Sequence, residues 1–244
     1  MAPPTAVIVT AHNEADRLPA TLAALAAAFP GARVLVADDG STDGSAEVAA
    51  AHGAEVVRSE RNQGKGGTAT LAAQRLLPLA SGPDPTPVIL LCDGDLAASA
   101  EVLKQLVEEV RSGRADLAVA AFARRVGGGF GWALGFARWA IRRRCGLVCD
   151  APISGQRALR AEVLPAVVPF APRFGMEIGM TIDAVRAGFR VAEVELPLAH
   201  RATGRTLGGF LHRGRQLVDF VAVFLQRRKA VVHAAGAAPR RSDH

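Results

Sequence analysis

The chain has 244 residues, of which 50% are hydrophobic and 21% charged, with a formal net charge of +6. This composition supplies a core for one large domain or two small ones, and it excludes a disordered chain, a collagen-like fibre and a coiled coil. The aromatic share of 5%, with no Tyr, argues against rows of side chains that stack on nucleic-acid bases.

Short apolar runs alternate along the chain with longer segments of helical periodicity. Strands are predicted at residues 6–9, 34–37, 54–57, 88–91, 117–122 and 191–196. Helices are predicted at residues 15–28, 43–52, 66–77, 99–112, 131–145, 174–187 and 208–230. This alternation predicts an α/β fold in one domain, with a mostly parallel sheet covered by helices on both faces. Ligands of such sheets bind at the carboxyl ends of the strands.

Three polar clusters follow predicted strands. They are Ala11-His12-Asn13-Glu14, Asp38-Asp39-Gly40-Ser41-Thr42-Asp43 and Asp93-Gly94-Asp95. Carboxylates that flank a glycine at a strand end can hold a divalent cation through oxygen ligands. Mg²⁺ or Mn²⁺ at this place would bridge a diphosphate and neutralise the charge that builds on it as it leaves.

Each cluster also has a structural interpretation. Asp-Gly-Asp is a common turn sequence. Asp38 and Asp39 begin either a turn before a helix capped by Ser41 or Thr42, or a site that accepts hydrogen bonds from a nucleobase or ribose. A Walker A loop is excluded around Lys65, because two glycines separate this lysine from Thr68. A dinucleotide-binding fingerprint is absent after the first strand.

A series of motifs, all in the expected order, resembles glycosyltransferase family 2, which has the GT-A fold, and within it the dolichyl- or polyprenyl-phosphate sugar synthases. The resemblance covers roughly residues 5–225. Besides the three clusters, it rests on Asn62-Gln-Gly-Lys65-Gly, Arg124 with Gly127-Gly128, Asp150-Ala-Pro-Ile-Ser154-Gly155-Gln156-Arg157, Phe174-Gly-Met-Glu177 and Arg201-Ala-Thr-Gly204-Arg205-Thr206. The chain departs from the family pattern at Ala97, Gln156 and Leu207, where Gln, Phe and Lys are usual.

The resemblance implies an inverting, metal-dependent transfer of a sugar from a nucleoside-diphosphate sugar. Asp93 and Asp95 would hold Mg²⁺ or Mn²⁺. The residues expected to bind the sugar nucleotide are Ala11, Asn13, Glu14, Asp38, Asp39, Lys65, Asp93, Gly94, Arg124 and Arg157. The expected catalytic residues are Asp150, Glu177 and Arg201.

The acceptor is left open between a polyprenyl phosphate and a soluble hydroxyl compound. A lipid phosphate is already anionic and needs no general base, whereas a hydroxyl would need Asp150 or Glu177 as a base. Arg124, Arg157 and Arg201 would steady phosphates through forked hydrogen bonds. A nucleic-acid-binding protein, a sugar-nucleotide pyrophosphorylase and a non-catalytic relative are the alternatives; we expect no nucleic-acid partner.

Charge is distributed unevenly along the chain. Residues 1–100 carry 6 basic and 11 acidic side chains, whereas residues 201–244 carry 9 and 2. The predicted helix at 208–230 combines apolar residues with arginines, so it either docks at a membrane surface or packs on the core. Three cysteines do not make a disulfide framework, and no secretion signal is visible, which favours a cytoplasmic protein, at the inner face of the membrane if it docks there.

No internal repeat and no interdomain linker is visible, so one domain is expected. A glycosyltransferase domain is expected over residues 1–232. Residues 5–122 would bind the nucleotide sugar and residues 123–232 the acceptor. Residues 233–244 are expected to form a disordered tail.

Overall fold

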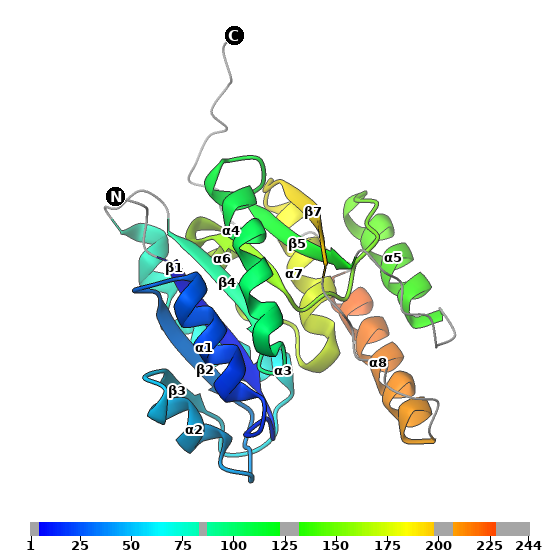
Figure 1. Ribbon diagram of the computed structural model, residues 1–244. Coiled ribbons are helices and arrows are strands. Elements are labelled where there is room, and N and C mark those ends of the chain that lie inside the picture. Colours follow the sequence, from blue (N-terminus) through cyan, green and yellow to red (C-terminus); the bar gives the residue numbers. More distant parts are fainter. Residues whose placement is uncertain (1–4, 83–86, 123–131, 198–206, 228–244) are drawn as a thin grey trace.

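The computed structural model describes residues 5–82, 87–122, 132–197 and 207–227 (Figure 1). Seven strands in these residues form one sheet in the order β3-β2-β1-β4-β6-β5-β7. They are β1 (Thr5–Ala11), β2 (Arg33–Asp38), β3 (Glu55–Arg58), β4 (Val88–Asp93), β5 (Leu117–Phe122), β6 (Arg157–Arg160) and β7 (Val191–Leu196). All neighbouring strands are parallel except those of β6, which is antiparallel to β4 and β5.

Helices cover both faces of the sheet. In Figure 1, α1 (Leu18–Ala28) and α4 (Lys104–Arg111) lie in front of the strands, and α2 (Ser45–Ala51) packs beside α1. The opposite face carries α3 (Lys65–Gln74), α6 (Leu164–Val167) and α7 (Met176–Arg186). Short 3-10 segments complete the chain path: η1 (Leu77–Ser81), η2 (Ala97–Leu103), η3 (Ala161–Val163) and η4 (Arg173–Gly175).

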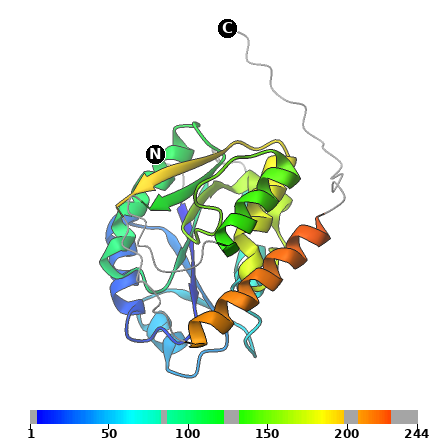
Figure 2. The same ribbon diagram turned by 90° about the vertical axis from the view of Figure 1, so that its right-hand side faces the viewer.

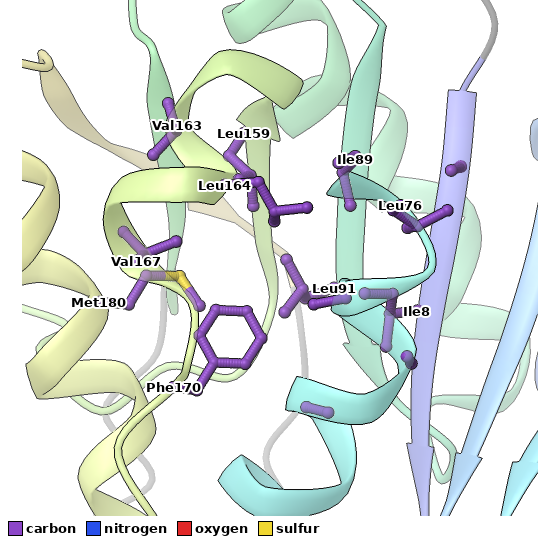
Figure 3. Packing of buried hydrophobic residues seen from close by; sticks show 14 of the residues in the cluster. Ile8, Leu76, Ile89, Leu91, Leu159, Val163, Leu164, Val167, Phe170 and Met180 are labelled. Carbon is purple, nitrogen blue, oxygen red and sulfur yellow. The ribbon is translucent and has the colours of Figure 1, made fainter. Parts of the chain in front are cut away.

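Each face of the sheet has its own hydrophobic cluster because side chains alternate along every strand. Figure 3 shows the cluster beneath α3 and α7, where Ile8 and Leu91 of adjacent parallel strands meet Phe170 and Met180. Val7 and Val9, which flank Ile8 along β1, pack under α1 and α4 on the other face. Strands buried on both sides explain why these segments are continuously apolar in the sequence.

A third cluster lies beyond the sheet, between α7, α5 (Trp132–Cys145) and α8 (Leu207–Gln226). Ile178 and Ile182 of α7 meet Phe220 and Val223 of α8. Gly175 permits this close packing, since a Cβ at that position would overlap the Val223 side chain. Figure 2 shows α8 crossing this side of the molecule diagonally, next to α5 and α7.

The predicted α/β class and mostly parallel sheet are confirmed, and each predicted strand overlaps an observed one. β6 was missed, because four residues with two arginines carry no strand pattern. The predicted helix cap at Ser41 or Thr42 was wrong: α2 begins at Ser45 after Gly44, whose φ of 86° suits glycine. The side chain of Asp43 accepts the Ser45 backbone N–H instead.

Candidate active site

The sheet register brings the three polar clusters to one edge. Ala11 at the end of β1 pairs with Asp38 of β2, and Thr10 pairs with Asp93 of β4. The chain leaves β2 and β4 on opposite sides of β1, which makes this edge the topological switch point of the sheet. Ligands of open α/β sheets bind in the crevice at such a point.

Lys65, the first residue of α3, joins two carboxylates from distant parts of the chain. Its Nζ lies 2.6 Å from Oδ1 of Asp93 and 3.0 Å from Oε1 of Glu177, which stands in the first turn of α7. The Glu177 side chain is buried, and the lysine and Asp93 are partly buried. The sequence named all three residues, and the structure brings them together as one ion-paired cluster.

The cluster fixes the charge states of its members. Burial by itself would raise the pKa of Asp93, but the Lys65 ammonium and the surrounding hydrogen bonds hold it below its ordinary value. Burial would likewise lower the pKa of Lys65, and the two carboxylates raise it above its ordinary value. Asp93 is therefore an anion and Lys65 a cation near neutral pH, in a pocket of reduced solvent screening.

Three further residues complete the surroundings of Asp93, and sequence reasoning had not assigned them a role. Its Oδ1 accepts a hydrogen bond from Oγ1 of Thr10 at 3.1 Å, and its Oδ2 accepts one from Nε2 of buried Gln156 at 2.8 Å. A Cβ on Gly155 would overlap Lys65 Nζ and lie 2.8 Å from Asp93 Oδ2. The loop before β6 therefore closes directly over the ion pair.

Asp39 organises the loop before α3. Its carboxylate accepts hydrogen bonds from the backbone N–H groups of Gln63 and Gly64 at 2.7 and 2.9 Å, and from Oγ1 of Thr68 at 2.6 Å. With these donors Asp39 supports the loop that delivers Lys65. Its role as a donor-binding residue stays a prediction.

Asp38 retains an unused acceptor. Its Oδ1 accepts hydrogen bonds from the Ser41 N–H and hydroxyl, whereas its buried Oδ2 accepts none within the described residues. Oδ2 faces Nε of Arg58 at 3.3 Å as an ion pair. A buried carboxylate oxygen at the strand edge that accepts no hydrogen bond suits the N–H or O–H of a bound base or ribose.

Asn13 and Glu14 continue β1 into the crevice. Asn13 has a φ of 56°, a conformation that Asn tolerates better than most residues, and its side-chain oxygen accepts the Thr42 N–H. Burial and the nearby Asp95 carboxylate raise the pKa of Glu14. A carboxylate whose pKa is raised by a second one nearby marks a place where a cation would be stabilised.

The residues present fit a divalent cation bound together with a diphosphate. No group of three or more His, Cys, Asp and Glu side chains suited to a metal occurs in the described part of the chain. Asp93 and Asp95 thus supply at most two carboxylates. Mg²⁺ is commonly held by one or two carboxylates, with substrate phosphates and water completing its shell.

Arg157 is placed differently from its expected role. The guanidinium is fully buried and donates to the carbonyls of Ser154 and Pro152 and to Oγ1 of Thr181. Burial lowers its pKa to about 10. Its donors hold the turn that carries Gly155, so Arg157 supports the site from behind and is not exposed to a phosphate.

The two candidate bases occupy different places. Glu177 lies in the cluster, whereas Asp150 is exposed, with Oδ1 3.2 Å from Nη2 of Arg138 on α5 and its backbone N–H donating to Glu193 of β7. The other residues expected in the site, Arg124 and Arg201, lie outside the described residues, as do the Gly127-Gly128 loop and the tail at 233–244.

A doubly wound sheet with acidic strand ends and a partly buried lysine at its switch point can bind a ligand at that edge. The chain belongs to glycosyl transferase family 2, whose family model matches residues 6–162. It is therefore a glycosyltransferase, as the motifs predicted. This membership selects the transferase over the pyrophosphorylase and nucleic-acid-binding alternatives.

Relatives of known sequence support this assignment. The chain is 33% identical over 210 residues to an uncharacterized glycosyltransferase of Mycobacterium tuberculosis, covering 82% of this chain and 87% of the relative. It is 34% identical over 215 residues to an undecaprenyl-phosphate mannosyltransferase of Micrococcus luteus, covering 82% and 85%.

A solved structure confirms the fold. Glucosyl-3-phosphoglycerate synthase of M. tuberculosis, crystallised with Mn²⁺, UDP-glucose and phosphoglyceric acid, superposes with a TM-score of 0.70 at 26% identity. The match covers 92% of this chain and 79% of that one. The predicted GT-A-type fold is thereby confirmed.

Proposed function

We propose that this glycosyltransferase moves a sugar from a nucleoside-diphosphate sugar, with a UDP-sugar the first candidate, to a polyprenyl phosphate, with inversion and with Mn²⁺ or Mg²⁺. The observation that carries the proposal is the Lys65–Asp93–Glu177 cluster at the switch point, beside Asp95. The M. luteus relative named for undecaprenyl phosphate supports the acceptor, and the M. tuberculosis structure with Mn²⁺ and UDP-glucose supports the donor and metal.

Residues on both sides of β1 have separate tasks in this proposal. Asp38, through its Oδ2 that accepts no hydrogen bond, and Asn13 would hold the base and ribose. Asp95 and Asp93 would hold the divalent cation, which when bound neutralises charge on the departing diphosphate. Lys65 supplies a second positive charge at the same place, and its pairing with Asp93 and Glu177 keeps it fixed before the donor arrives.

The acceptor decides whether a base is needed. A lipid phosphate is anionic and attacks the anomeric carbon directly from the face opposite the diphosphate. A soluble hydroxyl acceptor is the second candidate, favoured by the phosphoglyceric acid in the similar structure. For that acceptor Glu177 is the better-placed base, since it lies in the cluster while Asp150 lies against α5.

The acceptor also suggests where the protein works. The phosphate of a polyprenyl phosphate lies at the membrane surface, and we propose a peripheral protein on its cytoplasmic side. The three cysteines, all described, are free thiols, in accord with a reducing compartment. No helix among the described residues has the length and apolar character to cross a bilayer.

A transfer assay tests the proposal. The enzyme is incubated with UDP-glucose or GDP-mannose and Mn²⁺, and either undecaprenyl phosphate or 3-phosphoglycerate is added. We expect a glycosylated lipid phosphate, and product only from 3-phosphoglycerate would replace the lipid by the soluble acceptor. Asp95→Asn is expected to abolish Mn²⁺-dependent donor binding in calorimetry while leaving thermal unfolding unchanged; unaltered binding would refute the metal assignment.

A further inference from the structure

Exposed large apolar side chains are confined to one part of the described molecule. They are Trp139, Val148, Ile153, Val218, Val221 and Leu225. Four of the six lie on α5 and α8, and the other two lie between α5 and β6. A cluster of such side chains on one face, rather than scattered singly, marks an interaction surface.

The apolar side chains of α5 and α8 are continuous. Val218, Val221 and Leu225 are spaced at three and four residues, which places them along one stripe of α8, with 67%, 37% and 46% of their surface exposed. Trp139 of α5 is 49% exposed, and its ring centroid lies 4.7 Å from that of Phe224 of α8. The tryptophan therefore extends the stripe from one helix to the other.

The same face is basic. α5 contains four arginines and no acidic residue. Arg142 and Arg143 are exposed and follow Trp139 by three and four residues, so they lie next to it on the helix surface. Arg144 stacks on the Phe224 ring, with its guanidinium carbon 3.6 Å from the ring centroid. An apolar stripe flanked by arginines matches the interface of an anionic membrane.

The charge of this face favours an anionic membrane over a second copy of the chain as its binding partner. Two copies that met through α5 would bring the exposed Arg142 and Arg143 of each copy together, without an acidic residue on that helix to compensate. An anionic lipid surface instead attracts each exposed arginine, and half-exposed tryptophan is the side chain best suited to the boundary between headgroups and acyl chains.

We infer that α5 and α8 form a docking surface for an anionic membrane, with Trp139, Val218, Val221 and Leu225 entering the interface and Arg142 and Arg143 meeting the headgroups. This docking surface rests on the proposed function only in its purpose, which is to bring the enzyme to a lipid acceptor. The inner side of α8 packs on Gly175, two residues before Glu177. Docking by this face therefore holds the membrane next to the segment that carries the candidate site.

Arg227, which directly follows α8 and lies within the helix predicted at 208–230, takes no part in the docking surface. Arg227 pairs with Asp183 of α7, with Nε 2.8 Å from Oδ1 and Nη2 2.5 Å from Oδ2, and both side chains are largely buried. Reversing its charge would break the packing of α8, so Arg227 is unsuitable for a test of membrane binding.

The test uses vesicles of phosphatidylcholine with phosphatidylglycerol and without polyprenyl phosphate, so that it does not depend on the acceptor. The chain has two tryptophans, and Trp132→Phe leaves Trp139 as the single reporter. We expect its emission to shift to the blue on vesicle binding at low salt, and the shift to disappear at high salt or without the anionic lipid.

Matched variants locate the surface. Arg142→Ala with Arg143→Ala should weaken binding about 25-fold, from about 1 kcal/mol for each basic residue. Val218→Glu with Leu225→Glu should abolish the emission shift. Ala23→Glu with Ala27→Glu introduces the same charge on the exposed side of α1 and should change nothing. All variants should retain wild-type thermal unfolding, because the substituted side chains are exposed.

No binding at low salt, or equal weakening by the α1 control, would overturn the inference. A concentration-dependent dimer that loses its contact in Val218→Glu with Leu225→Glu, without vesicle binding, would also overturn it in favour of a second copy. Thermal stabilisation by UDP with Mn²⁺ is measured in parallel. Its absence beside intact vesicle binding would refute the proposed donor and leave the docking surface standing.

Discussion

The part of the molecule built on β1–β4 and the part built on α5, α7 and α8 treat apolar surface in opposite ways. In the described residues up to 122, no large apolar side chain is exposed. From residue 132 onward, six are. The first part has helices on both faces of the sheet, whereas α5 and α8 stand outside the sheet and each keeps one face uncovered.

Charge separates the same two parts. In the first part, Asp39 and Asp93 receive hydrogen bonds from backbone N–H groups, hydroxyls and one lysine at a strand edge. In the second, Asp183 and Arg227 tie two helices together while Arg142 and Arg143 face outward. The first arrangement is suited to a small anionic ligand bound in a crevice, and the second to an extended anionic surface.

The largest expected effect concerns the ion-paired cluster through which Lys65 and Asp93 of the first part meet Glu177 of α7. Lys65→Met leaves the Asp93 and Glu177 carboxylates without their cation, and the free energy of unfolding should fall by about 3 kcal/mol. Urea unfolding measures the change. Lys65→Met with Glu177→Gln should recover part of the loss, since one carboxylate is then neutral. Unchanged stability in the single variant would mean that solvent already screens the cluster.

In the second part, the corresponding test is the tie between α7 and α8. A double-mutant cycle with Arg227→Ala and Asp183→Ala should give a coupling energy of about 2 kcal/mol, because the pair is largely buried and bidentate. Binding of UDP with Mn²⁺ should stay at the wild-type level in variants that remain folded. A coupling energy near zero would show that apolar packing alone holds α8.

Much of this division was predictable from the sequence. Parallel strands buried on both faces are continuous apolar runs, so β1, β2 and β4 and the polar residues that follow them were found directly. The ends of parallel strands meet at one edge, which predicted that Asn13, Asp38 and Asp93 belong to one site.

Other contacts were beyond sequence reasoning because they join segments distant along the chain. The partners of Asp93 come from residues 10, 65 and 156, and only packing decides that Gly155 lies against Lys65. Arg157 matched a phosphate-binding motif, yet its guanidinium is buried on backbone carbonyls. A motif specifies the residue type, and burial specifies the direction in which the side chain points.

Asp116 is a buried carboxylate directly before β5, away from the two regions compared above. It tests whether a buried charge also contributes to stability there. Asp116 accepts hydrogen bonds from the Arg190 backbone N–H at 2.9 Å and from its guanidinium at 3.0 and 3.1 Å. Burial would raise the pKa of Asp116, but the hydrogen bonds from Arg190 lower it below the ordinary 3.8. Asp116→Asn should cost about 1.5 kcal/mol of stability at neutral pH without affecting UDP binding.

The pH dependence of this contribution has a definite sign. Because the folded chain has the lower pKa, the contribution of Asp116 is complete above pH 3.8 and is lost as the pH falls through the folded value. The difference in unfolding free energy between wild type and Asp116→Asn should therefore shrink below about pH 4. A difference that stays constant in acid would assign the effect to the shape of the side chain and not to its charge.

The smallest expected effect concerns the residue by which this chain departs from its family beside the site. Gln156 donates one hydrogen bond to Oδ2 of Asp93, while Thr10 and Lys65 hold the other oxygen. Gln156→Leu keeps the buried volume and removes this donor, so Asp93 gains freedom to rotate. We expect a loss of about 1 kcal/mol, seen as about fivefold weaker Mn²⁺-dependent UDP binding in calorimetry.

Gln156→Glu should weaken binding further, because it places a second carboxylate against Asp93. Equal affinities in wild type and Gln156→Leu, with Asp95→Asn still inactive, would mean that Asp95 acts alone on the cation and that Asp93 serves only to anchor Lys65.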